Sequence, residues 1–185
     1  LTVLDLRFLY RLANLYVEVF CSLYYKCSIL NCIFTLMIQP FDDTYFMKKA
    51  LQEAQDAFDK GEIPVGAVIV IKDRIIARAH NLTERLNDVT AHAEMQAITA
   101  AANFLGGKYL KDCTLYVTLE PCQMCAGALY WSQISRIVYA ARDEQRGCIN
   151  LNTKLHPKTK IEGGILAEEA SELLKRFFIE KRNLN

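Results

Sequence analysis

The sequence predicts an α/β domain in which helices pack on a sheet of about five short strands. Apolar runs of strand length alternate along the chain with segments whose apolar residues recur every three or four positions. The 185 residues are 52% hydrophobic and 23% charged, which suffices for one domain with a proper core. The seven cysteines are an odd number, and only Cys122 and Cys125 have a metal-like spacing. A disulfide framework is therefore not expected, and reduced thiols favour a cytoplasmic location.

The first predicted elements are a helix and a hairpin. Asp42 or Asp43 can cap a helix whose apolar residues keep helical spacing until Gly61 ends it. The apolar run 65–71 has the length of a strand, residues 72–73 form a turn, and residues 74–80 return as a second strand.

The rest of the chain continues the alternation of helices and strands. Thr90 is predicted to cap a second helix that Gly106 ends, and Pro121 suits the first turn of a third. The predicted elements are helices at about 91–104, 121–132 and 167–182, and strands at 113–119, 134–140 and 160–161.

Residues 1–36 differ from the rest of the chain. They are rich in Leu, Tyr, Phe and Cys, carry few charges, and precede Met37, the first methionine. Three explanations stay open: a mis-assigned start that translates upstream sequence, a helical extension, or a membrane anchor over 19–38, although Lys26 and Asn31 interrupt that stretch. We expect the functional domain to occupy residues 37–185 and expect no membrane partner.

Two short motifs carry the chemistry, and each stands at a predicted helix start. They are His92-Ala-Glu and, about thirty residues later, Pro121-Cys-Gln-Met-Cys. The two cysteines are about 300° apart around a helix, so their sulfurs are neighbours at its first turn, where the helix dipole favours thiolates. One imidazole completes three ligands, and three ligands with one open position are typical of catalytic zinc.

Glu94 stands two residues after His92, and such residues point roughly 200° apart on a helix. Both can reach one metal only if it lies near the N-terminal tip of that helix. There His92 would be a ligand, and Glu94 would carry protons between water and a leaving group without binding the metal.

Taken alone, the Cys-x-x-Cys pair could be a redox site or chance, and a single histidine is more often a core or surface residue. Together, H-x-E followed by P-C-x-x-C is the signature of the zinc deaminases of nucleobases.

On these motifs the chain resembles the TadA-type tRNA adenosine deaminases of the cytidine deaminase superfamily. The resemblance runs from about 43 to 182 and includes His80-Asn81 and the pair Phe177-Phe178. Its longer pieces are Gly61-Glu-Ile-Pro-Val-Gly-Ala-Val, Thr90-Ala-His-Ala-Glu-Met and Leu115-Tyr-Val-Thr-Leu-Glu-Pro-Cys-Gln-Met-Cys-Ala-Gly-Ala. It implies a three-layer α/β/α cytidine-deaminase-like fold with a central mixed sheet.

The resemblance also implies the roles of individual residues. His92, Cys122 and Cys125 would bind one Zn²⁺ per subunit, and Glu94 would be the proton shuttle. The implied substrate-binding residues are Asn81, Val65, Ala93, Asp143, Arg146 and Phe178. The implied reaction converts adenosine at the wobble position of a tRNA anticodon to inosine with release of ammonia, in a homodimer that binds the anticodon loop.

Two other functions stay open at this point. The pair Tyr130-Trp131 after the cysteine motif resembles the sequence of guanine deaminases at this place, and Val89 and the 147–153 loop depart from the TadA-type pattern. Guanine or a free nucleoside is therefore the alternative substrate. A catalytically silent zinc subunit that binds RNA or a partner protein is the third possibility, but it would have no use for Glu94.

The charge balance limits how RNA could bind. With 22 basic and 21 acidic residues the net charge is +1, so RNA affinity would have to come from a local patch. The candidate patches are the basic stretch 142–160 and the cations Lys175, Arg176, Lys181 and Arg182 near the C-terminus.

Overall fold

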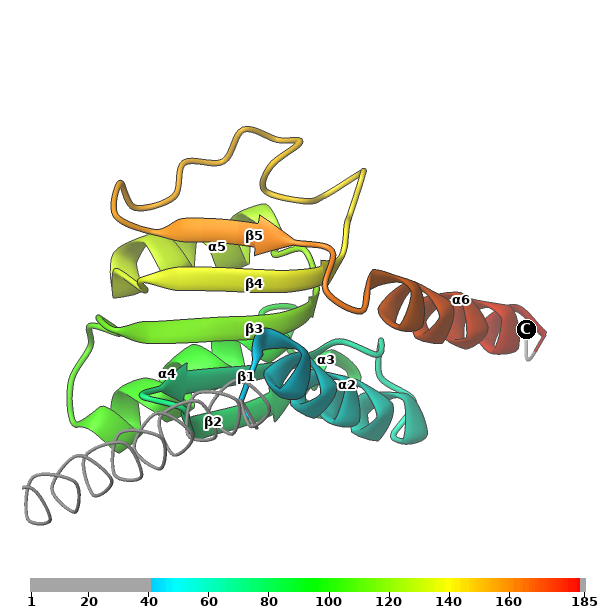
Figure 1. Ribbon diagram of the computed structural model, residues 1–185. Coiled ribbons are helices and arrows are strands. Elements are labelled where there is room, and N and C mark those ends of the chain that lie inside the picture. Colours follow the sequence, from blue (N-terminus) through cyan, green and yellow to red (C-terminus); the bar gives the residue numbers. More distant parts are fainter. Residues whose placement is uncertain (1–40, 184–185) are drawn as a thin grey trace, which may run out of the picture. The chain divides into compact units, whose positions relative to one another are not determined.

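Figure 1 shows the computed structural model of the chain, which describes residues 41–183. The expectations for residues 1–36, and the predicted boundary at Met37, lie outside the described residues. The elements are α2 (Asp43–Asp59), β1 (Gly66–Ile71), β2 (Arg74–His80), α3 (Thr83–Leu86), α4 (Ala93–Leu105), β3 (Cys113–Leu119), α5 (Gln123–Ser132), β4 (Arg136–Ala141), β5 (Lys160–Gly163) and α6 (Ala167–Asn183).

The strands form one mixed sheet in the order β2-β1-β3-β4-β5. β1 pairs antiparallel with β2 and β3, whereas β4 pairs parallel with β3 and β5. Lys72 and Asp73 both have positive φ, of 47° and 58°, which is the backbone of the tight turn that joins β1 to β2. The predicted layered α/β fold with a five-stranded mixed sheet is confirmed.

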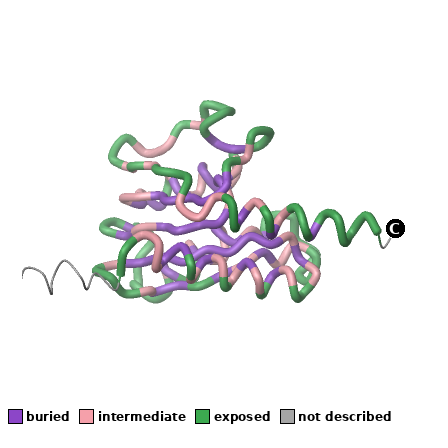
Figure 2. Tube along the Cα trace, turned by 45° about the vertical axis from the view of Figure 1, so that its right-hand side comes forward, coloured by how far each residue is buried: buried purple, intermediate pink, exposed green. Residues whose placement is uncertain are grey.

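Alternate residues of the strands face two separate cores. On one face Ile69, Leu115 and Ile137 pack with Ala97 of α4 and Leu129 of α5. On the other face Val68, Tyr116 and Val138 pack with Met47 of α2 and Ala170 of α6. The central strands β1, β3 and β4 are therefore mostly buried, and Figure 2 shows the buried residues gathered in the middle of the domain. Cover on both faces explains why β1 is a continuous apolar run rather than an alternating one.

Gly66 is needed where α2 crosses the first residue of β1. A Cβ at this position would overlap the backbone of Ala50 and Ala54 in α2. The missing side chain therefore lets the helix backbone lie directly against the strand.

Two helices begin later than predicted. Thr90 does not cap α4, because its amide and hydroxyl both donate to Asp88 within the preceding turn, and the N-cap residue is His92. Pro121 precedes the helix instead of opening it, and Cys122 is the N-cap residue of α5. The short helix α3 was not predicted. Within residues 41–183, no helix has the length and apolar character that a membrane crossing requires.

Candidate metal centre and active site

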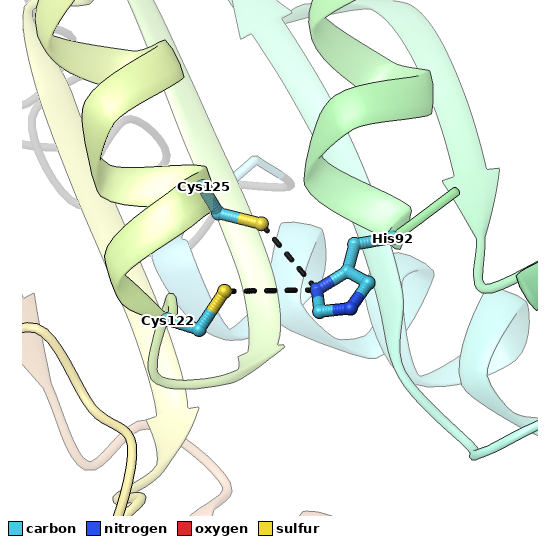
Figure 3. Close-up of side chains that lie close together, drawn as sticks. All are labelled: His92, Cys122 and Cys125. Atoms are coloured by element: carbon cyan, nitrogen blue, oxygen red, sulfur yellow. Dashed lines mark hydrogen bonds between the residues drawn. The ribbon is translucent and has the colours of Figure 1, made fainter. Parts of the chain in front are cut away.

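Two helix starts on the same face of the sheet bring the metal-ligand candidates together. His92 is the N-cap residue of α4, Cys122 is that of α5, and Cys125 lies one turn into α5. Neither N-cap side chain caps its own helix, and Figure 3 shows all three side chains directed toward one another. The side chains are therefore free to serve a common site between the two helices.

The spacing of the ligand atoms fits a tetrahedral metal ion. His92 Nδ1 lies 3.7 Å from Cys122 Sγ and 3.5 Å from Cys125 Sγ. All three ligand atoms lie within 4.8 Å of one another. Zinc bonds of ordinary length at the tetrahedral angle place nitrogen and sulfur roughly 3.6 Å apart. Two sulfurs and one imidazole are also the donor types that Zn²⁺ prefers.

The two thiols differ sharply in acidity. A hydrogen bond with Cys125 lowers the pKa of Cys122 to about 4, and His92 lowers it further against the effect of burial. The same hydrogen bond, together with burial and the nearby Glu94, raises the pKa of Cys125 well above its usual range. The hydrogen bond between the two sulfurs therefore favours the thiolate form at Cys122 and the protonated form at Cys125.

Glu94 lies beside this pair and is almost completely buried, with 3% of its surface exposed. Burial raises the pKa of its carboxyl group to about 7, and the Cys122 sulfur adds to this rise. The hydrogen bond with Cys122 raises the pKa of His92, and the Glu94 charge contributes as well. A carboxyl group with a pKa near neutrality can both accept and donate a proton, which general acid–base catalysis requires.

Three of the predicted substrate-binding residues are joined by hydrogen bonds. The backbone N–H of Asn81 donates to the Val65 carbonyl at 3.1 Å, and the side-chain Oδ1 of Asn81 accepts from the backbone N–H of Ala93 at 2.9 Å. Ala93 is the first residue of α4 and directly follows the candidate ligand His92. Asn81 therefore connects the start of β1 to the metal end of α4.

Asp143, Arg146 and Phe178 lie apart from that group. The Asp143 carboxylate accepts the backbone amides of Gln145 and Arg146, so it shapes the turn after β4. This turn reaches the site through backbone contacts with residues 121 and 122. Phe178 is half-exposed on α6, and its ring packs edge-on against that of Phe177, away from the metal-ligand candidates.

Sequence reasoning missed two buried carboxylates that bind backbone amides. Glu62 accepts the backbone amides of Glu84 and Arg85 and thereby holds the start of α3. Glu120 accepts the amides of Asp143 and Ile149. The only sequence signal for either was an acidic residue within a largely apolar stretch next to a motif.

The comparisons with known proteins agree with this geometry. The sequence model of the cytidine and deoxycytidylate deaminase zinc-binding region matches residues 41–141. A tRNA-specific adenosine deaminase of Aquifex aeolicus is 50% identical to this chain, over 75% of this chain and 95% of that protein. One from Bacillus subtilis is 45% identical, over 76% and 91% of the two chains.

Two solved structures of deaminases resemble this chain to different extents. A structure from studies of A-to-I editing by tRNA:A34 deaminases superposes with a TM-score of 0.67 at 42% identity, covering 71% of this chain and 99% of that one. A guanine deaminase of Bacillus subtilis is 45% identical, but it covers only 52% of this chain and 62% of its own, with a TM-score of 0.51. The tRNA deaminase structure thus matches over more of its own length and more of this chain than the guanine deaminase does. Together with the matching sequence model and the curated relatives, this shows that the chain belongs to the zinc-binding cytidine and deoxycytidylate deaminase family, among the tRNA-specific adenosine deaminases.

Proposed function

We propose that this protein hydrolyses adenosine at the wobble position of a tRNA anticodon to inosine and releases ammonia. The observation that carries the proposal is the meeting of His92, Cys122 and Cys125 beside the buried Glu94, where two helices begin. The relatives supply the substrate class, because they are tRNA-specific adenosine deaminases and match over almost their full length.

We propose that the three ligands hold one Zn²⁺ per chain. Bound there, the ion supplies Lewis-acid activation of water at neutral pH. Glu94 would take one proton from the attacking water and deliver it to the ring nitrogen as the carbon–oxygen bond forms at C6. It would then pass the proton of the new C6 hydroxyl to the amino group, so that the C6–N6 bond breaks and the amino group leaves as ammonia.

Asn81 is suited to orient the base. Its Oδ1 already accepts the Ala93 amide, so Nδ2 is the end of the side chain that remains to donate to a purine ring nitrogen. The residue is 5% exposed, which limits competition from water for that donor. An unstacked adenosine in an anticodon loop can reach such a recess at a lower cost than a base within a duplex.

The assembly is the second part of the proposal. We infer a homodimer, because Trp131 on α5 is 77% exposed and lies edge-on against Tyr130, a large apolar surface on a helix that carries metal ligands. Analytical ultracentrifugation of the unaltered chain and of Trp131→Glu tests this inference. A dimer that dissociates in the variant supports it, and a monomeric unaltered chain overturns it.

We also propose that the enzyme acts in the cytoplasm, because tRNA is the proposed substrate.

Guanine deamination is the second candidate, because the guanine deaminase of Bacillus subtilis shares 45% identity with part of this chain. Incubation of the purified protein with a tRNA panel, and separately with guanine, adenosine and cytidine, distinguishes the candidates when ammonia and inosine are both measured. We expect inosine in RNA and no ammonia from guanine. Ammonia from guanine with unchanged RNA would replace the proposed function by the alternative.

A further inference from the structure

Glu120 is a fully buried carboxylate that belongs neither to the metal ligands nor to the proton shuttle. It lies between the end of β3 and the N-cap residue of α5, and its side chain has 0% exposure. Its Oε2 accepts the Asp143 amide at 3.2 Å, and its Oε1 accepts the Ile149 amide at 2.8 Å. Both oxygens therefore bind the backbone of the segment that follows β4.

The segment held by Glu120 lies directly against a metal ligand. Gly147 forms a backbone bridge with Cys122, and the Cys148 amide donates to the Pro121 carbonyl at 2.9 Å. A Cβ at Gly147 would overlap both the Glu120 carboxylate and the Asp143 carbonyl. The Glu120 carboxylate therefore packs closely against the backbone of this segment, with no room for a side chain at Gly147.

The buried charge is poorly compensated except by this segment. Among the described residues, the cation that pairs with Glu120 is Arg142, whose Nε lies 4.0 Å away on a side chain that is 57% exposed. Arg142 also donates to Asn150 Oδ1 at 2.7 Å, so it ties the same segment a second time. Because a buried carboxylate is costly without donors, its charge stabilises the conformation in which both amides point at it.

We propose that Glu120 is a positioning residue that fixes residues 143–149 beside Cys122 and thereby places Asp143 and Arg146 for the RNA substrate. The inference rests on the proposed function, since Asp143 and Arg146 are expected to contact that RNA. Glu120 itself touches neither the metal site nor the base. Its loss should therefore affect capture of RNA more than the chemical step.

Glu120→Gln tests the role without changing the shape of the side chain. An amide has only one acceptor oxygen, so its NH₂ group must face either the Asp143 amide or the Ile149 amide and one hydrogen bond is lost. We expect the KM for an anticodon stem-loop to rise about tenfold, the order expected for one hydrogen bond to a charged group. The kcat and the zinc content should stay within about twofold of the unaltered chain, because the ligands and Glu94 keep their own contacts.

Gly147→Ala disturbs the same contact from the other side and should raise the KM in the same way. Asp43→Asn is the matched control, because it also converts a hydrogen-bonded carboxylate to an amide. Asp43 contacts Tyr116 and Arg136, and Arg136 begins β4, whereas residues 143–149 follow the end of that strand. A merely structural role for Glu120 predicts that Glu120→Gln and Asp43→Asn lower stability alike and leave the KM unchanged. That result would overturn the proposal.

Hydrogen–deuterium exchange supplies a readout that needs no substrate. In Glu120→Gln the amides of residues 143–149 should exchange faster, whereas in Glu62→Gln the increase should be confined to residues 83–86. Faster exchange at 143–149 in both variants would indicate general loosening and contradict the inference. If the unaltered chain fails to deaminate RNA, the proposed function is wrong. The hydrogen–deuterium exchange of residues 143–149 then still decides whether Glu120 holds this segment.

Discussion

Glu94 illustrates how environment gives an ordinary side chain the acidity that the proposed proton shuttle needs. Glu94 is the second residue of α4, where the free amides of the helix would normally keep a carboxylate ionised, yet burial raises its pKa to about 7. It stands two residues after His92, so it lies at the same end of the helix as that candidate ligand. A carboxyl group that changes protonation near neutral pH can serve both halves of a proton transfer.

Replacing Glu94 by Ala separates proton transfer from metal binding. We expect the variant to keep the zinc content of the unaltered chain, because the three ligands remain, and to lose deamination by about 10²–10⁴-fold. Metal analysis by mass spectrometry and an inosine assay on the same sample check both parts. Loss of zinc from the variant would mean that Glu94 helps to bind the metal.

Asp43 shows a residue-scale effect on stability rather than on chemistry. Arg136 donates to both of its oxygens at 2.6 and 2.7 Å, and Tyr116 donates to the first of them. Hydrogen bonds from Arg136 hold the pKa of Asp43 below its ordinary value of 3.8. Since the folded chain then binds fewer protons than the unfolded chain, this stabilisation is complete at neutral pH and is lost as the pH falls below that value.

The variant Asp43→Asn should therefore be less stable than the unaltered chain at pH 7, by about 1–2 kcal/mol once partial exposure is allowed for. Thermal unfolding measured at pH 7 and at pH 3 checks the sign. The difference in melting temperature should shrink at pH 3, where the carboxylate is increasingly protonated. An equal difference at both pH values would contradict the assigned cause.

At the scale of elements, the candidate metal site joins the starts of α4 and α5. The N-cap residue of each helix is a candidate ligand whose side chain does not cap its own helix, so these side chains are directed toward one another between the two helices. A bound ion would then cross-link two elements that are separated by β3 in the sequence.

Removal of the metal should therefore lower the melting temperature as well as abolish activity, because an ion that binds only the folded state stabilises it. A chelator titration followed by thermal unfolding measures this effect, and added Zn²⁺ should restore both properties while Mg²⁺ should not. An unchanged melting temperature after complete metal removal would show that the site does not cross-link the helices.

Helix α6 carries the cations predicted to bind RNA. Arg176 stacks on the ring of Phe58 and Lys181 on that of Phe177, so two of them also cover apolar surface. Replacing Lys175, Arg176, Lys181 and Arg182 by Ala should weaken tRNA binding and flatten its dependence on salt, because fewer counterions are released.

The matched control removes the same number of cations near the β1–β2 turn and before β3, namely Lys72, Arg74, Lys108 and Lys111. Binding isotherms over a series of salt concentrations, with a melting curve for each variant, compare the two sets. Equal salt slopes for the α6 variant and the unaltered chain would show that α6 is only a solvated surface.

Features whose sequence signals are local could be predicted. The hairpin at 66–80 was found because its strands and turn are contiguous, and the meeting of His92, Cys122 and Cys125 was expected because the two motifs that contain them stand at helix starts. The exact starts of α4 and α5 were not, because the residues at those positions do not cap by side chain. Glu62 and Glu120 could not be found, because each binds amides more than twenty residues away in the sequence.

At the scale of the described domain, the site gathers at one end of the sheet. β2 ends at His80 opposite the beginning of β1 at Gly66, and β3 ends at Leu119 beside the end of β4 at Ala141. The segments that leave these ends carry Asn81, the two cysteines and Asp143. The two apolar cores thus support the candidate site, whose residues lie in or next to the connections at one end of the sheet.

The central claim is that the zinc-loaded protein deaminates the wobble adenosine. Its most direct test offers one anticodon stem-loop with adenosine at the first anticodon position, and a second in which that adenosine is moved to a neighbouring loop position. Inosine is then mapped by reverse transcription. We expect inosine in the first RNA alone, with Glu94→Ala inactive on both; equal conversion of the two RNAs, or conversion of guanine with both RNAs intact, would contradict the claim.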